Sequence, residues 1–339
     1  MRNYKKTIIG STILILLLVM SCLYPYYGPK DYNHQVLVYD DQGKITGRAP
    51  FPPSSEHWLG TNRNGEEFHW LLLYGAKFTL IATFGVALLR VLIGGVVGIF
   101  ISLWAPFLKS YFKDFFLTFR YIPSILIAII LMIPIANGFY DYVAISSIVT
   151  YQIIILVFIG FPSVVLFTSD VTDELLKTSF VQSSYLMGAS KFHVLKRQLL
   201  PYMRSYGILF SVQQLLSTLH ITMQLGIFGL FLGGKNRGGI FGYDDPPKPA
   251  TLSNEWAGLI GQSFGDLILS PWVALVPALA YFVVIFIVNM MKKEMEDNLS
   301  GIHVVKMKKK KGERELPVQA GHPEKSKFDF VEEGRMESI

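Results

Sequence analysis

Long apolar runs dominate this sequence of 339 residues and restrict the folds that it can adopt. A helix needs about 20 mostly apolar residues to cross a bilayer core of roughly 30 Å. Only 17% of the residues are charged, whereas soluble domains average about 25%. The chain is therefore predicted to be an all-α integral membrane protein with about six transmembrane helices, at 7–24, 78–105, 117–136, 143–167, 205–232 and 271–291.

The runs divide the chain into three parts. Residues 1–76 are predicted to hold an N-terminal transmembrane helix and an extracytoplasmic segment, and residues 77–299 to hold five helices with a cytoplasmic loop at 168–204. Residues 300–339 are polar and include the run KMKKKKGERE. This composition predicts a disordered polybasic tail that lies against anionic lipid.

Lysine and arginine predict the orientation of the chain. If both termini are cytoplasmic, 22 of these residues lie on the inner side of the membrane and 8 on the outer side. Without the tail the counts are 11 and 8. Cytoplasmic loops carry an excess of Lys and Arg, so the bias favours both termini inside. The net charge of +6 is thus interpreted as a topology signal and not as a nucleic-acid-binding surface.

Cys22 is the single cysteine, which excludes an intrachain disulfide. No cysteine–histidine cluster that would bind a metal occurs in the sequence, and no cofactor is predicted. Val19-Met20-Ser21-Cys22 follows a basic start and an apolar core, and it resembles a lipoprotein cleavage box. Either Cys22 is cleaved and lipidated, or the first helix is uncleaved. Met20 fits such boxes poorly, so the uncleaved helix is favoured.

Three patterns predict local structure. Residues 35–48 alternate around Asp41-Gln42-Gly43, as in a small β-hairpin. Residues 254–268 are predicted to form a short amphipathic helix at the membrane surface. Gly94 and Gly98 lie four residues apart in the second run, a spacing that lets two membrane helices approach closely.

Ionisable residues inside the runs discriminate between classes of transporter. No Asp or Glu falls well inside any run, whereas proton- or sodium-coupled carriers commonly place carboxylates there. Only Arg90 and His220 are found. Arg90 could line a solute route, but a structural pairing with backbone carbonyls or a partner subunit is favoured. His220 could line the route too, although a hydrogen-bonded helix contact is the more common role.

Residues 180–204 read FVQSSYLMGASKFHVLKRQLLPYMR and are called the inner loop below. They predict two short helices joined at Gly188, because glycine adopts backbone conformations that other residues resist. Ser190 is a good N-cap for the second helix, and Pro201 suits the start of the next one. One face of the second helix carries an apolar stripe, made of Phe192, Leu195 and Leu199. Such a helix pair either lies on lipid or docks into a cytoplasmic partner.

The inner loop also contains a spaced pattern. Gln182-Ser183-Ser184 is followed after three residues by Gly188, and after nine more by Gln198-Leu199-Leu200-Pro201. This resembles the permease subunits of binding-protein-dependent ABC importers, whose pattern is Glu-Ala-Ala, three residues, Gly, nine residues and Ile-x-Leu-Pro. The spacing is kept, and four residues match by type: Gly188, Ala189, Leu200 and Pro201. Gln-Ser-Ser replaces Glu-Ala-Ala and removes a charge, and Gln198 replaces Ile.

The segment 57–80, HWLGTNRNGEEFHWLLLYGAKFTL, narrows the resemblance. It is similar to the form HxLGTDxxGRDxxSRLxYGARxSL of oligopeptide and dipeptide permeases, and it departs from that form at Asn62, Glu66 and Glu67. Ser270-Pro271-Trp272 resembles part of the last span of that subfamily. The resemblance covers most of residues 50–300 and implies the C-type partner of a permease pair, with one N-terminal helix added to a five-helix core.

The resemblance implies a membrane subunit of an ATP-driven importer for oligopeptides or dipeptides in a bacterial cell membrane. Its implied partners are a second permease subunit, two cytoplasmic ABC ATPase subunits, an extracytoplasmic substrate-binding protein and the lipid bilayer. The implied ATPase-coupling residues are Gln182, Ser183, Ser184, Gly188, Ala189, Ser190, Phe192, Leu195, Leu200 and Pro201. No GxxxxGK[ST] phosphate loop occurs, so the chain itself is not expected to be an ATPase or another enzyme.

Three alternatives stay open. The solute could be a nickel complex or another small solute. The Gln-Ser-Ser sequence also fits an orphan or regulatory permease-like subunit that no longer couples to ATP. A membrane-embedded enzyme would need converging catalytic groups, but no HExxH, GxSxG or aspartate pair appears in or beside the runs.

Overall fold

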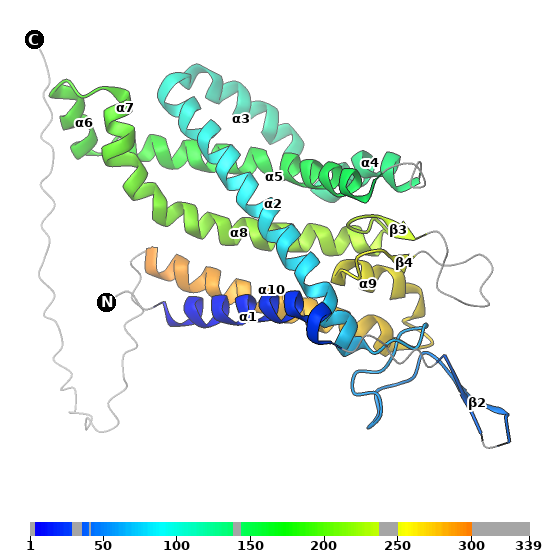
Figure 1. Cartoon of the computed structure of the whole chain (residues 1–339). Helices are drawn as coiled ribbons and strands as arrows, with labels where there is room; N and C mark the ends of the chain where they lie inside the picture. The colour runs from blue at the N-terminus through cyan, green and yellow to red at the C-terminus, as the bar shows by residue number, and fades with distance from the viewer. Residues whose placement is uncertain (1–3, 29–35, 41, 138–143, 237–249, 300–339) are drawn as a thin grey trace, which may run out of the picture. The chain divides into compact units, whose positions relative to one another are not determined.

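The computed structural model describes residues 4–28, 36–40, 42–137, 144–236 and 250–299, most of which are helical (Figure 1). The long helices are α1 (Lys5–Tyr27), α2 (Phe68–Trp104), α5 (Ile145–Leu176), α8 (Leu200–Ile227) and α10 (Pro271–Leu299). The shorter helices are α3 (Pro106–Arg120), α4 (Ser124–Asn137), α6 (Ser179–Leu186), α7 (Lys191–Val194) and α9 (Trp256–Ser263). Two antiparallel pairs join β1 (Leu37–Tyr39) to β2 (Ile45–Arg48) and β3 (Lys235–Asn236) to β4 (Ala250–Thr251). The predicted polybasic tail lies outside the described residues.

Four described helices, α1, α2, α5 and α10, are long and apolar enough to cross a membrane. They confirm the prediction of an all-α membrane protein. The predicted third span falls on α3 and α4, and α4 has only 14 residues. The predicted fifth span falls on α8, which has 28 residues but is not among the four. Two of the six predicted spans therefore lie on helices that length and composition alone do not assign to the membrane.

α2 packs closely against α5 at the two glycines singled out in the sequence. A Cβ added at Gly94 would lie 2.7 Å from the side chain of Val164, and one at Gly98 would lie 2.7 Å from the carbonyl oxygen of Val165. Real Cβ atoms do not approach other atoms this closely, so only glycine permits the contact. The predicted close approach of two helices is confirmed.

The start of α1 lies beside the end of α10. The carboxylate of Glu294 accepts hydrogen bonds from the backbone N–H groups of Lys6 (3.0 Å) and Thr7 (2.6 Å), which the first turn of α1 leaves free. Figure 1 shows α6 and α7 near this end of the helices, and β2, β4 and α9 near the other end. The start of α1 and the end of α10 thus lie at the same end of the helices as the inner loop (Figure 1).

The segment between α1 and α2 forms the predicted hairpin and a tight loop. β1 and β2 pair around residues 40–44, which confirms the hairpin at 35–48. In the loop that follows, the Oδ1 of Asn62 accepts hydrogen bonds from the N–H groups of Asn64 and Glu66, both at 2.9 Å. The Nδ1 of His57 lies 2.6 Å from the Oε1 of Glu67. Arg63 reaches Asp266, beyond α9, and ties the loop to that helix.

α9 is a helix, as predicted, but it is buried against other helices and does not present the expected amphipathic surface. Residues 256–260 are all buried, and the indole Nε1 of Trp256 donates to the carbonyl oxygen of Leu72 (2.8 Å). Gly226 on α8 and Gly261 on α9 let the two backbones touch, because a side chain at either glycine would collide with the facing backbone. The run WAGLI is apolar on every face of the helix, so burial satisfies it better than a surface does.

Candidate functional site

The inner loop folds as two short helices joined at Gly188, as predicted. Gly188 has a φ of +88°, in the left-handed region that glycine adopts without strain. The N–H of Ala189 donates to the carbonyl oxygen of Ser184 (3.0 Å) and closes α6. The Oγ of Ser190 accepts a hydrogen bond from the N–H of His193 (3.3 Å), so Ser190 caps α7 as predicted.

A π-helical turn, Leu195–Leu199, joins α7 to α8 and changes the predicted apolar stripe. A π turn has more residues per turn than an α-helix, so it rotates the following residues to another face. Leu199 is fully buried, whereas Phe192 is exposed. The prediction that they share one face is therefore wrong. Pro201 lies in the first turn of α8, as predicted.

The base of the inner loop is packed onto the C-terminal ends of α2 and α5. One apolar cluster joins these elements, and its buried members are Leu103, Leu175, Val181, Val194 and Leu199. The Nζ of Lys191 donates to the carbonyl oxygen of Leu103 (2.8 Å), one of the carbonyls that the end of α2 leaves free. The loop is thus attached to two long helices, and a displacement of the loop would be carried to both.

The tip of the inner loop exposes large apolar side chains. Leu186 is 89% exposed, Met187 80% and Phe192 66%, and we call these three residues the apolar tip. An exposed apolar cluster on an otherwise polar segment is typical of an interaction surface. The other predicted coupling residues lie in three environments: Gln182, Ser183, Gly188, Ser190, Leu200 and Pro201 are exposed, Ala189 and Leu195 are half-buried, and Ser184 is buried.

Arg90 is fully buried on α2. Its Nε donates to the carbonyl oxygen of Leu156 on α5 (2.9 Å), and its Nη1 donates to the Oε1 of Gln214 on α8 (3.3 Å). Gly160 makes room for the guanidinium, because a Cβ there would collide with it. Arg90 therefore has the structural pairing with a backbone carbonyl that the sequence favoured, and in this arrangement it offers no surface to a solute.

His220, in contrast to Arg90, is exposed on α8. Its side chain makes no hydrogen bond with the residues that the structure describes. The structure therefore separates the two ionisable residues that were predicted inside the spans, one buried in a helix contact and one turned outward.

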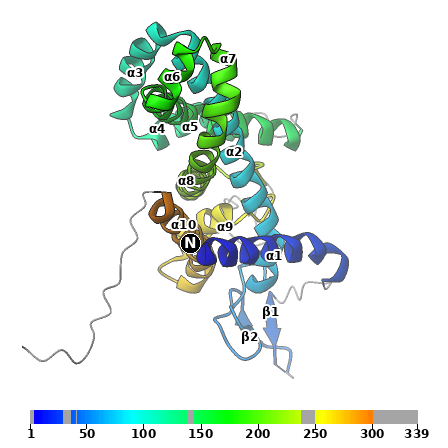
Figure 2. The same cartoon turned by 90° about the vertical axis from the view of Figure 1, so that its left-hand side faces the viewer.

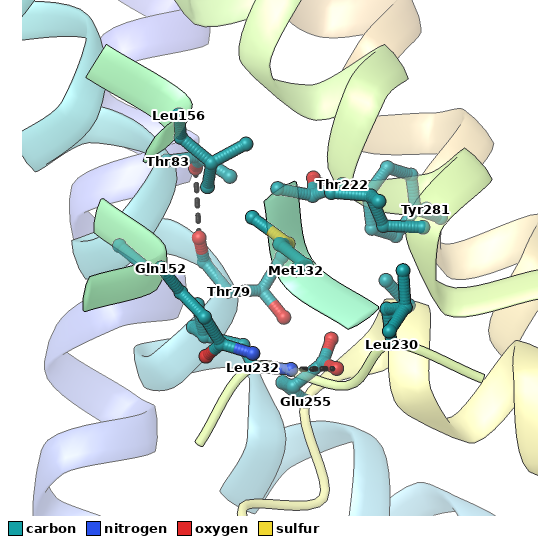
Figure 3. Close-up of a pocket in the computed structure, with 13 residues that line it drawn as sticks. Thr79, Thr83, Met132, Gln152, Leu156, Thr222, Leu230, Leu232, Glu255 and Tyr281 are labelled. Carbon is teal, nitrogen blue, oxygen red and sulfur yellow. Dashed lines mark hydrogen bonds between the residues drawn. The ribbon is translucent and has the colours of Figure 1, made fainter. Parts of the chain in front are cut away.

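A small, mainly apolar pocket with several polar side chains in its lining lies among the helices near α9 (Figure 3). Its volume of about 20 Å³ suffices for one water molecule. The polar side chains that line it come from five parts of the chain and are Thr79, Thr83, Gln152, Thr222, Glu255 and Tyr281. The Oε1 of Glu255 accepts a hydrogen bond from the N–H of Leu232 (3.2 Å). Burial raises the pKa of Glu255 to about 7.

Sequence reasoning missed Glu255. The search for carboxylates considered the six apolar runs, and Glu255 enters the helix packing from the segment that precedes α9. Its neighbours in the pocket lie far away along the chain, so no spacing pattern marks it. The only local signal is its place directly before the apolar run WAGLI.

Comparison with known proteins identifies relatives that match most of the chain. No family model matches it. The chain is 23% identical over 295 residues to the glutathione transport system permease protein GsiD of Pectobacterium atrosepticum, a match that covers 86% of this chain and 85% of that protein. It is also 23% identical to the GsiD proteins of Escherichia coli O1:K1, over 305 residues, and of Shigella boydii serotype 4, over 302 residues. Each of these two matches covers 88% of this chain and 87% of the relative.

This chain is related to the permeases of ABC importers. The resemblance drawn from the inner loop and from residues 57–80 is thereby confirmed. A match of this length within 339 residues includes the inner loop wherever it begins. Together with the four long apolar helices, the relationship describes a multi-pass membrane protein with a permease role.

Proposed function

We propose that this chain is the membrane-spanning permease subunit of an ATP-driven importer for peptide-like solutes. The observation that carries the proposal is the inner loop, which presents an apolar tip on a base packed onto α2 and α5. The relatives are named for transport of glutathione, a peptide-like solute, which supports oligopeptides, dipeptides and compounds of similar size as the cargo.

In this proposal two ABC ATPase subunits dock beneath the permease pair, and the apolar tip sits in a cleft of an ATPase subunit. Closure of the ATPases on ATP displaces the loop, and the buried cluster around Leu103 and Leu175 carries the displacement to α2 and α5. The helices then tilt as rigid bodies and switch access from one side to the other. The lysine and arginine bias supports a cytoplasmic location for both termini and for the loop.

A second, related permease subunit and an external substrate-binding protein complete the proposed importer. The loop between α1 and α2 lies at the end of the helices away from the apolar tip (Figure 1). Its turn around Asn62 and its tie from Arg63 to Asp266 make it an ordered surface. We propose that the binding protein delivers solute on this side.

Reconstitution tests the coupling. The chain, its permease partner and candidate ATPases are co-expressed, purified and placed in liposomes. The substrate-binding protein is supplied with a labelled dipeptide on the solute side, and uptake of the dipeptide is measured with and without ATP. Leu186→Asp places a charge on the apolar tip, so we expect it to abolish co-purification of the ATPases and uptake. Ile45→Asp, on the exposed hairpin at the other end, is the matched control for ATPase docking and should retain co-purification of the ATPases. Normal ATP-driven uptake by the Leu186→Asp variant would exclude the docking role.

The Gln-Ser-Ser sequence favours a second candidate, a permease-like subunit that does not couple to ATP. Gln182 and Ser183 are exposed on α6 and bring no negative charge to a partner. In the same liposomes this candidate predicts ATPase binding without ATP-driven uptake, or no ATPase binding at all.

A further inference from the structure

The C-terminal half of α8 turns a row of polar side chains outward. Ser217, His220 and Gln224 are all exposed, and their spacings of three and four residues place them on one face of the helix. The residues between them, such as Thr218 and Leu219, are buried against neighbouring helices. None of the three exposed side chains forms a hydrogen bond with another residue that the structure describes. We call them the polar face of α8.

Other long helices expose apolar side chains along their middles. On α2 the exposed residues include Phe84, Leu88 and Leu92, and on α10 they include Leu279, Phe282 and Phe286. Such surfaces suit lipid tails. The polar face helps to explain why α8, with 28 residues, is not among the described helices that are apolar enough to cross a membrane by composition.

Lipid is a poor cover for the polar face. Hydrocarbon offers no hydrogen-bond partner, and each polar group left unpaired there costs several kcal/mol. The rest of the fold does not cover it either, because all three side chains stay exposed although α2, α9 and α10 pack against α8. Figure 2 shows α8 with α2 on one side and with α9 and α10 below it. Water or a partner must therefore satisfy these groups.

We propose that the polar face of α8 lines the water-filled route through which the solute crosses the membrane. This rests on the proposed function, which supplies the solute and the second subunit that would close the route. Hydroxyl, imidazole and amide groups can donate and accept hydrogen bonds, and the face carries no carboxylate. It suits a solute rich in amide and carboxylate groups that must bind weakly enough to leave again.

Cysteine labelling tests the lining in membranes that contain the chain with its partners. Cys22 is exposed and would react itself, so all variants are made in a chain that carries Cys22→Ser. Ser217→Cys, His220→Cys and Gln224→Cys are each treated with a charged, membrane-impermeant thiol reagent. Leu279→Cys and Phe282→Cys on α10 are the controls. Because the reactive thiolate forms in water, we expect the polar-face positions to react at least about 10-fold faster than the controls.

Contact with the solute is tested separately by uptake. His220→Leu should lower the rate of dipeptide uptake about 10-fold, whereas His220→Gln, which keeps hydrogen-bonding groups, should retain most of it. Equal uptake by both variants and the wild type would overturn the proposed solute contact.

The labelling outcomes distinguish this inference from the proposed function. If the polar-face cysteines react as slowly as the α10 controls, the proposed lining is overturned. It is also overturned if these cysteines cross-link to the second permease subunit but do not react with the charged reagent. If wild-type uptake is ATP-driven in either case, the proposed function stands without the lining. Fast labelling without any ATP-driven uptake supports the water-filled face and contradicts the proposed function.

Discussion

Gln198 donates a hydrogen bond from its Nε2 to the Oγ of Ser184, and both residues stand where the inner loop departs from the importer pattern. The pattern has alanine and isoleucine at these positions, so two apolar side chains would face each other there. In this chain Ser184 also donates to the carbonyl oxygen of Phe180 (3.1 Å). A polar contact thus replaces an apolar one between α6 and the π turn, and the two departures compensate each other.

Removing one partner of this pair should cost more than removing both. Ser184→Ala leaves the half-buried amide of Gln198 without its acceptor, at a cost of about 1–3 kcal/mol. Ser184→Ala combined with Gln198→Ile removes both polar groups and should be nearly as stable as the wild type. Thermal unfolding of the four proteins in detergent measures the coupling. Additive effects of the two single substitutions would show that the hydrogen bond contributes nothing specific.

Gly188 should be required for its backbone conformation and not for lack of space. No atom lies within 4 Å of a Cβ added there, but the φ of +88° disfavours β-branched residues by about 1–2 kcal/mol. Gly188→Val should therefore disturb the loop and reduce ATP-driven uptake while membrane insertion stays normal. Gly188→Asn should retain more uptake, because asparagine adopts this region more readily. The same loss in both variants would contradict the conformational explanation.

Gly160 should be intolerant of any side chain because of Arg90. A Cβ at Gly160 would collide with the guanidinium, so Gly160→Ala must displace a buried arginine from the carbonyl of Leu156. We expect a loss of roughly 1–3 kcal/mol in stability, seen as a lower unfolding temperature in detergent. Gly95→Ala on α2 is the matched control, since no atom lies within 4 Å of its added Cβ. A Gly160→Ala protein as stable as the Gly95→Ala protein would refute the contact.

Glu255 should make the stability of the chain fall as pH rises. Its pKa is about 7 in the folded chain, because of burial, against 4.5 for an ordinary glutamate. Between these values the folded state holds more protons than the unfolded state, so the free energy of unfolding decreases with increasing pH and the loss is complete above about pH 7. The full difference corresponds to roughly 3 kcal/mol.

Glu255→Gln tests this dependence because glutamine keeps the shape and loses the titration. Unfolding temperatures are compared at pH 5 and pH 8 in detergent. The wild type should lose stability relative to the variant between these pH values, and the two should be similar at pH 5. Parallel pH dependence in both proteins would place the titrating group elsewhere.

The sequence alone determined the class of the protein and the local features of the inner loop. The length of an apolar run identifies a membrane helix. The conformational preferences of Gly188, Ser190 and Pro201 act within a few residues, so the neighbouring sequence suffices to predict the turn and the helix starts of the inner loop. The close approach at Gly94 and Gly98 could be predicted for the same reason, because small residues at that spacing lie on one face of one helix.

Only the tertiary structure decided which faces are covered and by what. Arg90 meets Leu156, Glu255 enters a pocket whose polar lining comes from five parts of the chain, and α9 is buried although its sequence suggested a surface helix. These outcomes depend on contacts between residues far apart along the chain. The π turn adds a further reason, because it rotates Leu199 away from the face of Phe192, and no local residue preference signals that rotation.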